Sequence, residues 1–127
     1  MIEELPIISS YTRAQALEDG VLIDVSKTAR EAGFVFPVAV SNTLWSRYIQ
    51  PSEQAKQYGQ SIEGRLWDVI WLARIKASRS SGSRFEYKVI FQDGPHPKDK
   101  HQPIIIANCG PGDDMRPVVT LMLPEDD

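Results

Sequence analysis

The stretch from Ser61 to Ser78, SIEGRLWDVIWLARIKAS, decides the fold class of this chain. Its apolar residues recur at the spacing of a helix, so six of them share one face: Ile62, Leu66, Val69, Ile70, Ala73 and Ala77. Trp67 and Trp71 lie four residues apart beside that face and widen the apolar stripe. The pattern therefore predicts one long helix, buried at the centre of a small domain.

Shorter helices are expected before this central helix. They cover residues 12–17, 27–32 and 43–49, with Thr12, Ser26, and Ser41 or Asn42 as the capping residues. Between them, residues 21–25 are β-branched and apolar, which is typical of a strand or an extended segment. Residues 34–40 are interrupted by Pro37 and predict an extended link or an edge strand. The polar residues 51–60 predict a loop or an exposed short helix.

The chain after the central helix carries strand signals. Alternation of apolar and polar residues predicts a strand over 85–91, and apolar runs predict two more over 103–109 and 118–123. Three consecutive strands favour an antiparallel meander. We therefore predict a single α+β domain over residues 1–127, with short mobile tails at both ends. In it, a mainly antiparallel sheet of three or four strands packs against the long helix and the short helices.

Eight residues are expected in the core of this domain: Phe34, Trp67, Val69, Ile70, Ala73, Val89, Ile105 and Leu121. The composition, with 42% hydrophobic and 24% charged residues, is that of a soluble globular protein. No apolar run approaches the length of a membrane span, about 18 residues. Two glutamates stand where a signal peptide would carry lysines. Cys109 is the only cysteine, which excludes an intramolecular disulfide and fits a reducing, cytoplasmic setting.

The segment from Cys109 to Asp114, CGPGDD, is the best candidate for a chemical site. Its glycines and proline predict a tight turn, whose carboxylates Asp113 and Asp114 could bind a hard cation, contact a partner or bond the local backbone. The spacing matches no calcium loop, and bonding to the local backbone is the simplest interpretation. Cys109 needs a base to act as a nucleophile, and only His96 or His101 could supply one through strand pairing. Zinc binding by these histidines would need further ligands.

Two groups of charged residues are also candidates for a role. Asp68 is expected to pair with Arg65, or with a residue from another helix, as a structural ion pair at the edge of the core. A basic patch with Phe85 and Tyr87 interleaved suits single-stranded nucleic acid, although a helix end followed by a strand gives the same pattern. Its four basic residues are Lys76, Arg79, Arg84 and Lys88. The net charge of −3 argues mildly against non-specific DNA binding.

The chain resembles an uncharacterised family of small bacterial proteins carried on plasmids, integrative conjugative elements and other mobile DNA. The segments that carry the resemblance are residues 11–17, 19–25, 29–34, 37–40, 64–69 (GRLWDV), 109–114 (CGPGDD) and 119–124. This resemblance implies a role as an accessory protein of a mobile element, and it brings no catalytic residue with it. Small acidic proteins in that setting are often antagonists of host defence, including anti-CRISPR proteins, which is an argument by analogy.

The expected function is therefore that of a non-enzymatic protein that binds a CRISPR or other defence effector complex. Acidic side chains can occupy a cationic nucleic-acid channel, and five are expected to do so: Asp113 and Asp114 on the turn, with Glu125, Asp126 and Asp127 beside it. One alternative is a nucleic-acid-binding transfer or maintenance factor, and another is a small enzyme with its site at 109–114. No catalytic, metal-binding or cofactor-binding residue is assigned, and the sequence indicates no oligomeric state.

Overall fold

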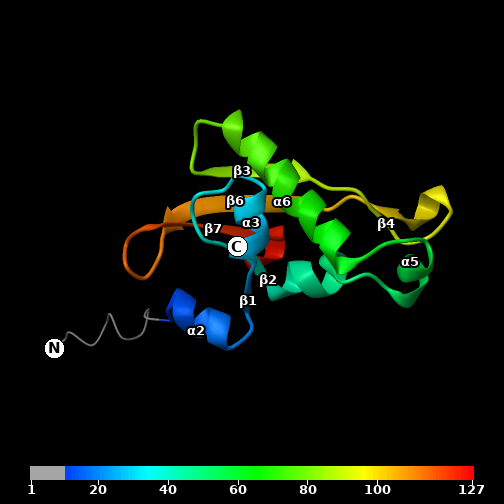
Figure 1. The fold of residues 1–127 in the computed structure, drawn as a ribbon, viewed down its shortest axis with the longest axis horizontal. Helices are drawn as coiled ribbons and strands as arrows, with labels where there is room; N and C mark the ends of the chain where they lie inside the picture. The colour runs from blue at the N-terminus through cyan, green and yellow to red at the C-terminus, as the bar shows by residue number, and fades with distance from the viewer. Residues whose placement is uncertain (1–10) are drawn as a thin grey trace.

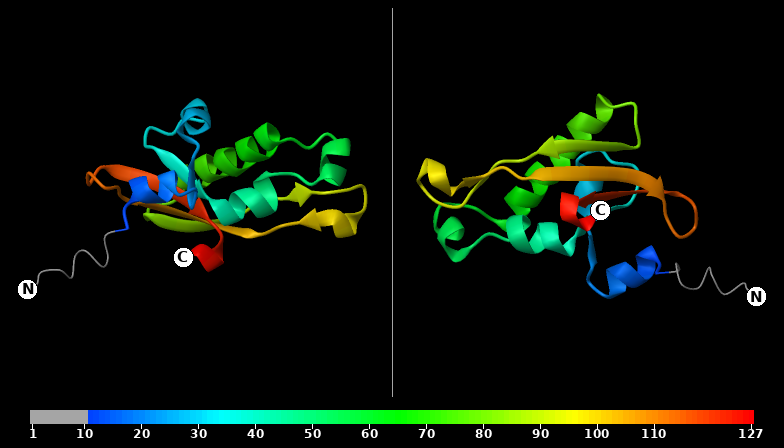
Figure 2. Two further views of the ribbon diagram at one scale, coloured as in Figure 1. Left: turned by 90° about the horizontal axis from the view of Figure 1, so that it is seen from below. Right: turned by 180° about the vertical axis from the view of Figure 1, so that it is seen from behind.

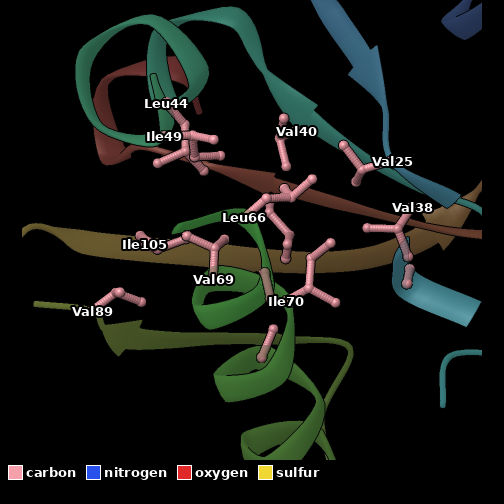
Figure 3. Close-up of a cluster of buried hydrophobic side chains, with 14 of the residues drawn as sticks. Val25, Val38, Val40, Leu44, Ile49, Leu66, Val69, Ile70, Val89 and Ile105 are labelled. Atoms are coloured by element: carbon pink, nitrogen blue, oxygen red, sulfur yellow. The ribbon is translucent and has the colours of Figure 1, made fainter. Parts of the chain in front are cut away.

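The computed structural model describes residues 11–127 (Figure 1). The predicted central helix is present as α6 (Ile62–Ser78), and the Ser61 hydroxyl caps it by accepting a hydrogen bond from the backbone N–H of Gly64 at 3.0 Å. Leu66, Val69 and Ile70 project from α6 toward strand residues such as Val40 and Ile105 (Figure 3). The helix therefore covers one face of the sheet, as its apolar spacing predicts.

The sheet has five strands in the order β1 (Leu22–Asp24), β2 (Val38–Ser41), β7 (Pro117–Met122), β6 (Ile104–Pro111) and β3 (Arg84–Lys88). Neighbouring strands are antiparallel, except that β2 and β7 are parallel. The α+β class and the mainly antiparallel sheet are thus confirmed, as is the meander β3–β6–β7. The strand count is five rather than three or four because β2 pairs with β7 and brings β1 into the sheet.

The predicted strand over 85–91 is interrupted. β3 ends at Lys88, and β4 (Phe91–Gln92) pairs instead with β5 (Lys100–His101) in a separate two-stranded ribbon. The turn η2 (Pro97–Asp99) lies between them. The inward alternation still holds across the break, because Tyr87, Val89 and Phe91 are all buried. The alternation of buried and exposed side chains was therefore predicted correctly. The change of pairing partner after Lys88 was not predicted.

Four short helical segments precede α6: α2 (Arg13–Glu18), α3 (Ser26–Glu31), α4 (Asn42–Leu44) with the π turn η1 (Trp45–Ile49), and α5 (Glu53–Gln57). Thr12 and Ser41 cap α2 and α4 as predicted. Ser26 is not a cap but the first residue of α3, and its buried hydroxyl bonds Asp24 and the backbone N–H of Val38. This hydroxyl links α3 to the start of β2.

The predicted core is confirmed except at two aromatic residues. Six of the expected residues are buried: Val69, Ile70, Ala73, Val89, Ile105 and Leu121. Phe34 is only partly buried and packs at the margin of the core. Trp67 is 37% exposed, because the sheet covers the face of α6 that carries Leu66 and Val69 while Trp67 lies on the flank.

The opposite face of the sheet is covered by α2 and by the C-terminal turn η3 (Pro124–Asp126). Arg13 of α2 donates to the Thr120 hydroxyl at 2.7 Å. The C-terminal segment lies across the sheet from α6 (Figure 2, left), where Ile106 and Met122 are buried. The C-terminal residues that were expected to form a tail lie against the sheet as η3. The expected N-terminal tail falls outside the described residues.

The β6–β7 hairpin ends in a tip where Met115 has a φ of 71° and is 76% exposed. A left-handed conformation is costly for a residue with a Cβ, whereas glycine adopts it readily. We expect Met115→Gly to raise the free energy of unfolding by about 0.5–1 kcal/mol in urea titrations. Met115→Ala, which keeps the Cβ, should stay within about 0.5 kcal/mol of the parent. Equal stabilities of the glycine and alanine variants would show that this conformation carries no cost.

Candidate functional site

The two carboxylates of the predicted acidic turn have separate structural roles. Asp113 accepts hydrogen bonds from the backbone N–H groups of Arg13 and Ala14, both at 2.9 Å, and so joins the hairpin to the first turn of α2. These bonds, first that from Ala14 and then that from Arg13, hold the pKa of Asp113 below its ordinary value. Asp114 instead bonds the local backbone at Arg116 and approaches the Arg116 guanidinium. The local interpretation is thus right for Asp114, whereas Asp113 makes a long-range contact.

The three C-terminal acids lie at the other end of β7 and each has a partner. Asp126 accepts bonds from the Ser41 hydroxyl at 2.7 Å, the Leu123 N–H at 3.0 Å and the Thr43 hydroxyl. Partial burial raises the pKa of Asp126, but these bonds outweigh it and the net shift is downward. Two ion pairs complete the set: Glu125 with Arg47 at 2.6 Å, and Asp127 with Arg84.

The five acids expected to bind a partner therefore do not form one surface. β7 separates Asp113 and Asp114 from residues 125–127, and its six residues span about 20 Å. The expectation that the C-terminal acids lie beside the turn is wrong. Residues that precede a strand and residues that follow it lie at its opposite ends, so they cannot meet unless the chain folds back along the strand.

Asp113 and Asp114 can be separated by mutation. We expect Asp113→Asn to lower stability at neutral pH, because an amide offers one acceptor oxygen in place of two. The carboxylate contribution is present above the ordinary pKa of 3.8 and is lost as the pH falls through the lower folded value. The stability difference between parent and variant should therefore shrink below pH 3.8 in urea titrations. Asp114→Asn should behave like the parent throughout. A constant difference across this pH range would contradict the assigned role of Asp113.

The predicted basic patch is divided between two elements, because Lys76 and Arg79 belong to the C-terminal end of α6 while Arg84 and Lys88 belong to β3. Arg84 and Lys88 lie on the exposed side of the edge strand β3, and Arg84 is paired with Asp127. Phe85 and Tyr87 point the other way, toward α6, where the Tyr87 hydroxyl donates to the carbonyl of Val69 at 2.9 Å. Burial raises the pKa of the Tyr87 phenol above its ordinary value. The aromatic rings are therefore not available as a stacking platform beside these cations.

Cys109 and the two histidines lie at opposite ends of β6. Cys109 is hydrogen-bonded through its backbone to Ser83, whereas His101 is in β5 and pairs with Asp93 at 3.0 Å. Six residues of extended chain separate Pro103 from Cys109, a span of about 20 Å. Within residues 11–127, no strand pairing joins a histidine to the thiol. In the same range, no group of three histidine, cysteine or acidic residues is placed to hold a metal ion.

The outer flank of α6 presents two tryptophans to solvent. The Trp67 and Trp71 rings stack with their centroids 5.7 Å apart and their planes 10° from parallel. Trp71 is 42% exposed, and Leu72 next to it is also exposed. Large exposed apolar side chains that gather in one place mark interaction surfaces, and tryptophan is enriched among residues that dominate binding energy.

An apolar cavity of about 360 Å³ lies at the C-terminal end of the same helix. Its floor is the helix-facing side of the sheet, formed by Phe85, Ala107, Cys109 and Val119. Its walls are α6 on one side and residues 33–36, between α3 and β2, on the other. Sequence analysis missed this cavity. The only signal is a set of small residues that are far apart in the chain: Gly33, Ala73, Ala77, Gly82 and Ser83.

The whole chain, residues 1–127, matches a family described as a family of unknown function, DUF6573, and the chain belongs to that family. No curated protein and no solved structure matches the chain. Among the described residues, none of the helices is both long enough and apolar enough to cross a membrane.

Proposed function

We propose that this DUF6573 protein is a non-enzymatic binding protein that engages a protein partner through the outer flank of α6. The observation that carries the proposal is the stacked and exposed pair Trp67–Trp71. Stacking fixes both rings against each other and against the helix, so they lose little side-chain freedom on binding. Rigid aromatic side chains of this kind are typical anchors of protein interfaces.

The position of the pair on the helix supports this role. The buried face of α6 carries Leu66, Val69, Ile70 and Ala73, which already fill the space above the sheet. Trp67 and Trp71 are not part of that fully buried layer, since they are 37% and 42% exposed. Exposed tryptophan lowers the solubility of a protein, so the presence of two such residues at this surface favours a role in binding.

The resemblance to proteins of mobile DNA narrows the proposed partner to a defence effector complex, such as a CRISPR complex, with this protein as its antagonist. An antagonist that acts by occupancy should inhibit the effector's nucleic-acid cleavage in proportion to its amount, with full inhibition near one molecule per complex. An enzyme would inhibit at far lower ratios and leave a modified product. The alternative of a transfer or maintenance factor predicts direct DNA binding that weakens steeply with salt.

The proposal is tested by the double variant Trp67→Ala/Trp71→Ala. The tagged parent is used to capture a partner from a lysate of the encoding organism, and the affinity of the purified partner is then measured. We expect the double variant to bind at least about 30-fold more weakly, as for the loss of an interface hot spot.

The matched control is Tyr58→Ala, which removes an exposed aromatic side chain that follows α5. It should bind like the parent. Asp114→Lys tests the acidic contact expected from the sequence without disturbing the bonds of Asp113. If the tryptophan variant keeps full affinity while Asp114→Lys loses it, the contact surface is the acidic hairpin and not α6.

A further inference from the structure

We propose that the apolar cavity beside α6 receives a large apolar side chain of a protein partner, and that an acidic side chain of the same segment pairs with Arg74. This inference rests on the proposed function, because it names a second contact on the same flank of α6. It also assigns a chemistry to the partner: an apolar anchor next to a carboxylate. The cavity itself can be tested without any partner.

The cavity exists because small residues meet where α6 crosses the end of the sheet. Ala73 and Ala77 lie on the helix above Ala107 and Cys109 of β6, and Gly82 and Ser83 close the end. Larger side chains at these positions would fill the space from within, as Leu66 and Ile70 do nearer the N-terminus of α6. An apolar hollow forfeits packing contacts, which a ligand restores. Its volume of about 360 Å³ is within the range of binding pockets.

A polypeptide fits the surroundings better than a small molecule does. Val35 at the rim is 84% exposed and Phe36 is also exposed, so a ligand confined to the cavity would leave apolar rim uncovered. Trp67, Trp71, Arg74 and Ser78 follow one another at helical spacing along one flank of α6, and the last two line the cavity. This flank extends over about 16 Å, the length of several residues of an extended segment.

Among residues 11–127, Arg74 is the only charged residue that lines the cavity. Its Nε donates to the carbonyl of Gly33 at 3.3 Å, and no carboxylate among residues 11–127 lies within ion-pair distance of its guanidinium. Gly33 has a φ of 105°, and a Cβ there would lie 3.1 Å from Nε. Glycine at this position thus allows the guanidinium to approach the loop and stay at the rim. A carboxylate from a partner could pair with its remaining N–H groups.

Two fluorescent probes test the cavity on the purified protein. N-phenyl-1-naphthylamine is an apolar aromatic amine, and 1-anilinonaphthalene-8-sulfonate is the same molecule with an added sulfonate. We expect both to bind the folded parent. Ala77→Phe, which fills the cavity, should abolish binding of both probes, and Ala77→Leu should weaken it. Arg74→Gln should weaken the sulfonate probe about fivefold and leave the neutral probe unchanged.

Cys109 provides an internal reporter, since it is the only cysteine and lies on the cavity floor. Its rate of reaction with a small maleimide should fall when the neutral probe is bound. Unchanged probe binding in both Ala77 variants would overturn the cavity assignment. An equal effect of Arg74→Gln on both probes would overturn the assignment of an acidic complement. Melting temperatures verify that each variant is folded.

Failure here is distinguishable from failure of the proposed function. If Trp67→Ala/Trp71→Ala loses partner affinity while Ala77→Phe keeps it, the binding role of the α6 flank stands and the cavity takes no part in it. Loss of affinity in both would place the partner along the whole flank. The third outcome is that the probes bind the parent but neither Trp67→Ala/Trp71→Ala nor Ala77→Phe changes partner affinity. This outcome would overturn the proposal that a peptide occupies the cavity, which would then be a site for a small apolar molecule.

Discussion

Replacing Arg65 by methionine is expected to lower the free energy of unfolding by about 3–5 kcal/mol. Arg65 is only 3% exposed, although its side chain is charged. Removing one member of a buried ion pair is among the most costly changes in a protein, because the other member is left without its partner. For a domain of ordinary stability, about 5–15 kcal/mol, such a loss is a large share of the total.

The cost follows from the number of groups that Arg65 satisfies. Its guanidinium donates to the carbonyl of Tyr48 at 2.7 Å, to that of Gln92 at 3.2 Å and to Asp93 at 2.6 Å, while its Nε donates to the amide oxygen of Gln60 at 3.0 Å. It also lies over the Phe91 ring, 5.3 Å from the ring centroid. Methionine has similar length but no donors, so these acceptors would lose their partner together.

Urea unfolding measures the effect, and Asp68 supplies the control. Asp68 is exposed, so Asp68→Asn should change stability by less than about 0.5 kcal/mol. Arg65→Lys should recover only part of the loss, because one ammonium cannot reproduce the fork of the guanidinium. The assigned role of Arg65 is wrong if Arg65→Met and Asp68→Asn have similarly small effects.

The hydrogen-bond partners of Arg65 could not be predicted from the sequence. Asp68 was expected to pair with Arg65 or with a residue from another helix. The structure pairs Arg65 with Asp93, 28 residues away, at 2.6 Å. A helix pattern identifies which residues share a face, but the identity of a long-range partner depends on how the ribbon β4–β5 folds back. Asp68 itself is exposed and forms no ion pair among residues 11–127, so the ion pair expected at Asp68 is wrong.

The sheet follows the same rule. Alternation and apolar runs predicted the positions of β3, β6 and β7, because these are properties of each segment alone. The parallel pairing of β2 with β7 joins residues 38–40 to residues 119–121, and no local signal marks it. Ser26 was misread for a similar reason, since its hydroxyl accepts a hydrogen bond from the backbone N–H of Val38 in strand β2.

The candidate site was harder to predict than the fold. The acidic residues were conspicuous in sequence, yet Asp113, Asp126 and Asp127 are bound to other parts of the same chain. Trp67 and Trp71 were equally conspicuous. Trp67 was assigned to the core, and Trp71 was counted as part of the apolar stripe of the helix. Both errors have one cause: composition shows that a residue is charged or apolar, but only the tertiary structure shows whether its bonding or packing capacity is already used. The cavity beside α6 had no local sequence signal, because the small residues that form it come from segments that are far apart in the chain.

The second large effect is expected at Ile70, on the buried face of α6. Ile70 is fully buried between the helix and the strands (Figure 3). Ile70→Ala should cost about 3–5 kcal/mol, because it removes buried methyl groups and leaves a cavity that rigid strands on one side cannot close. Trp71→Ala removes a larger side chain, but one that is 42% exposed, and should cost only about 1–2 kcal/mol from lost stacking and partial burial.

The two substitutions should separate further when partner binding is measured. Ile70→Val, which costs about 0.5–1.5 kcal/mol and keeps the protein folded, should bind the partner with the affinity of the parent. Trp71→Ala should keep most of its stability and lose affinity, because its ring contributes to the flank and not to the layer above the sheet. The measurements are urea titrations and partner affinities of Ile70→Ala, Ile70→Val and Trp71→Ala. If Trp71→Ala destabilises the protein as much as Ile70→Ala does, the tryptophan flank belongs to the core and the binding role proposed for α6 loses its basis.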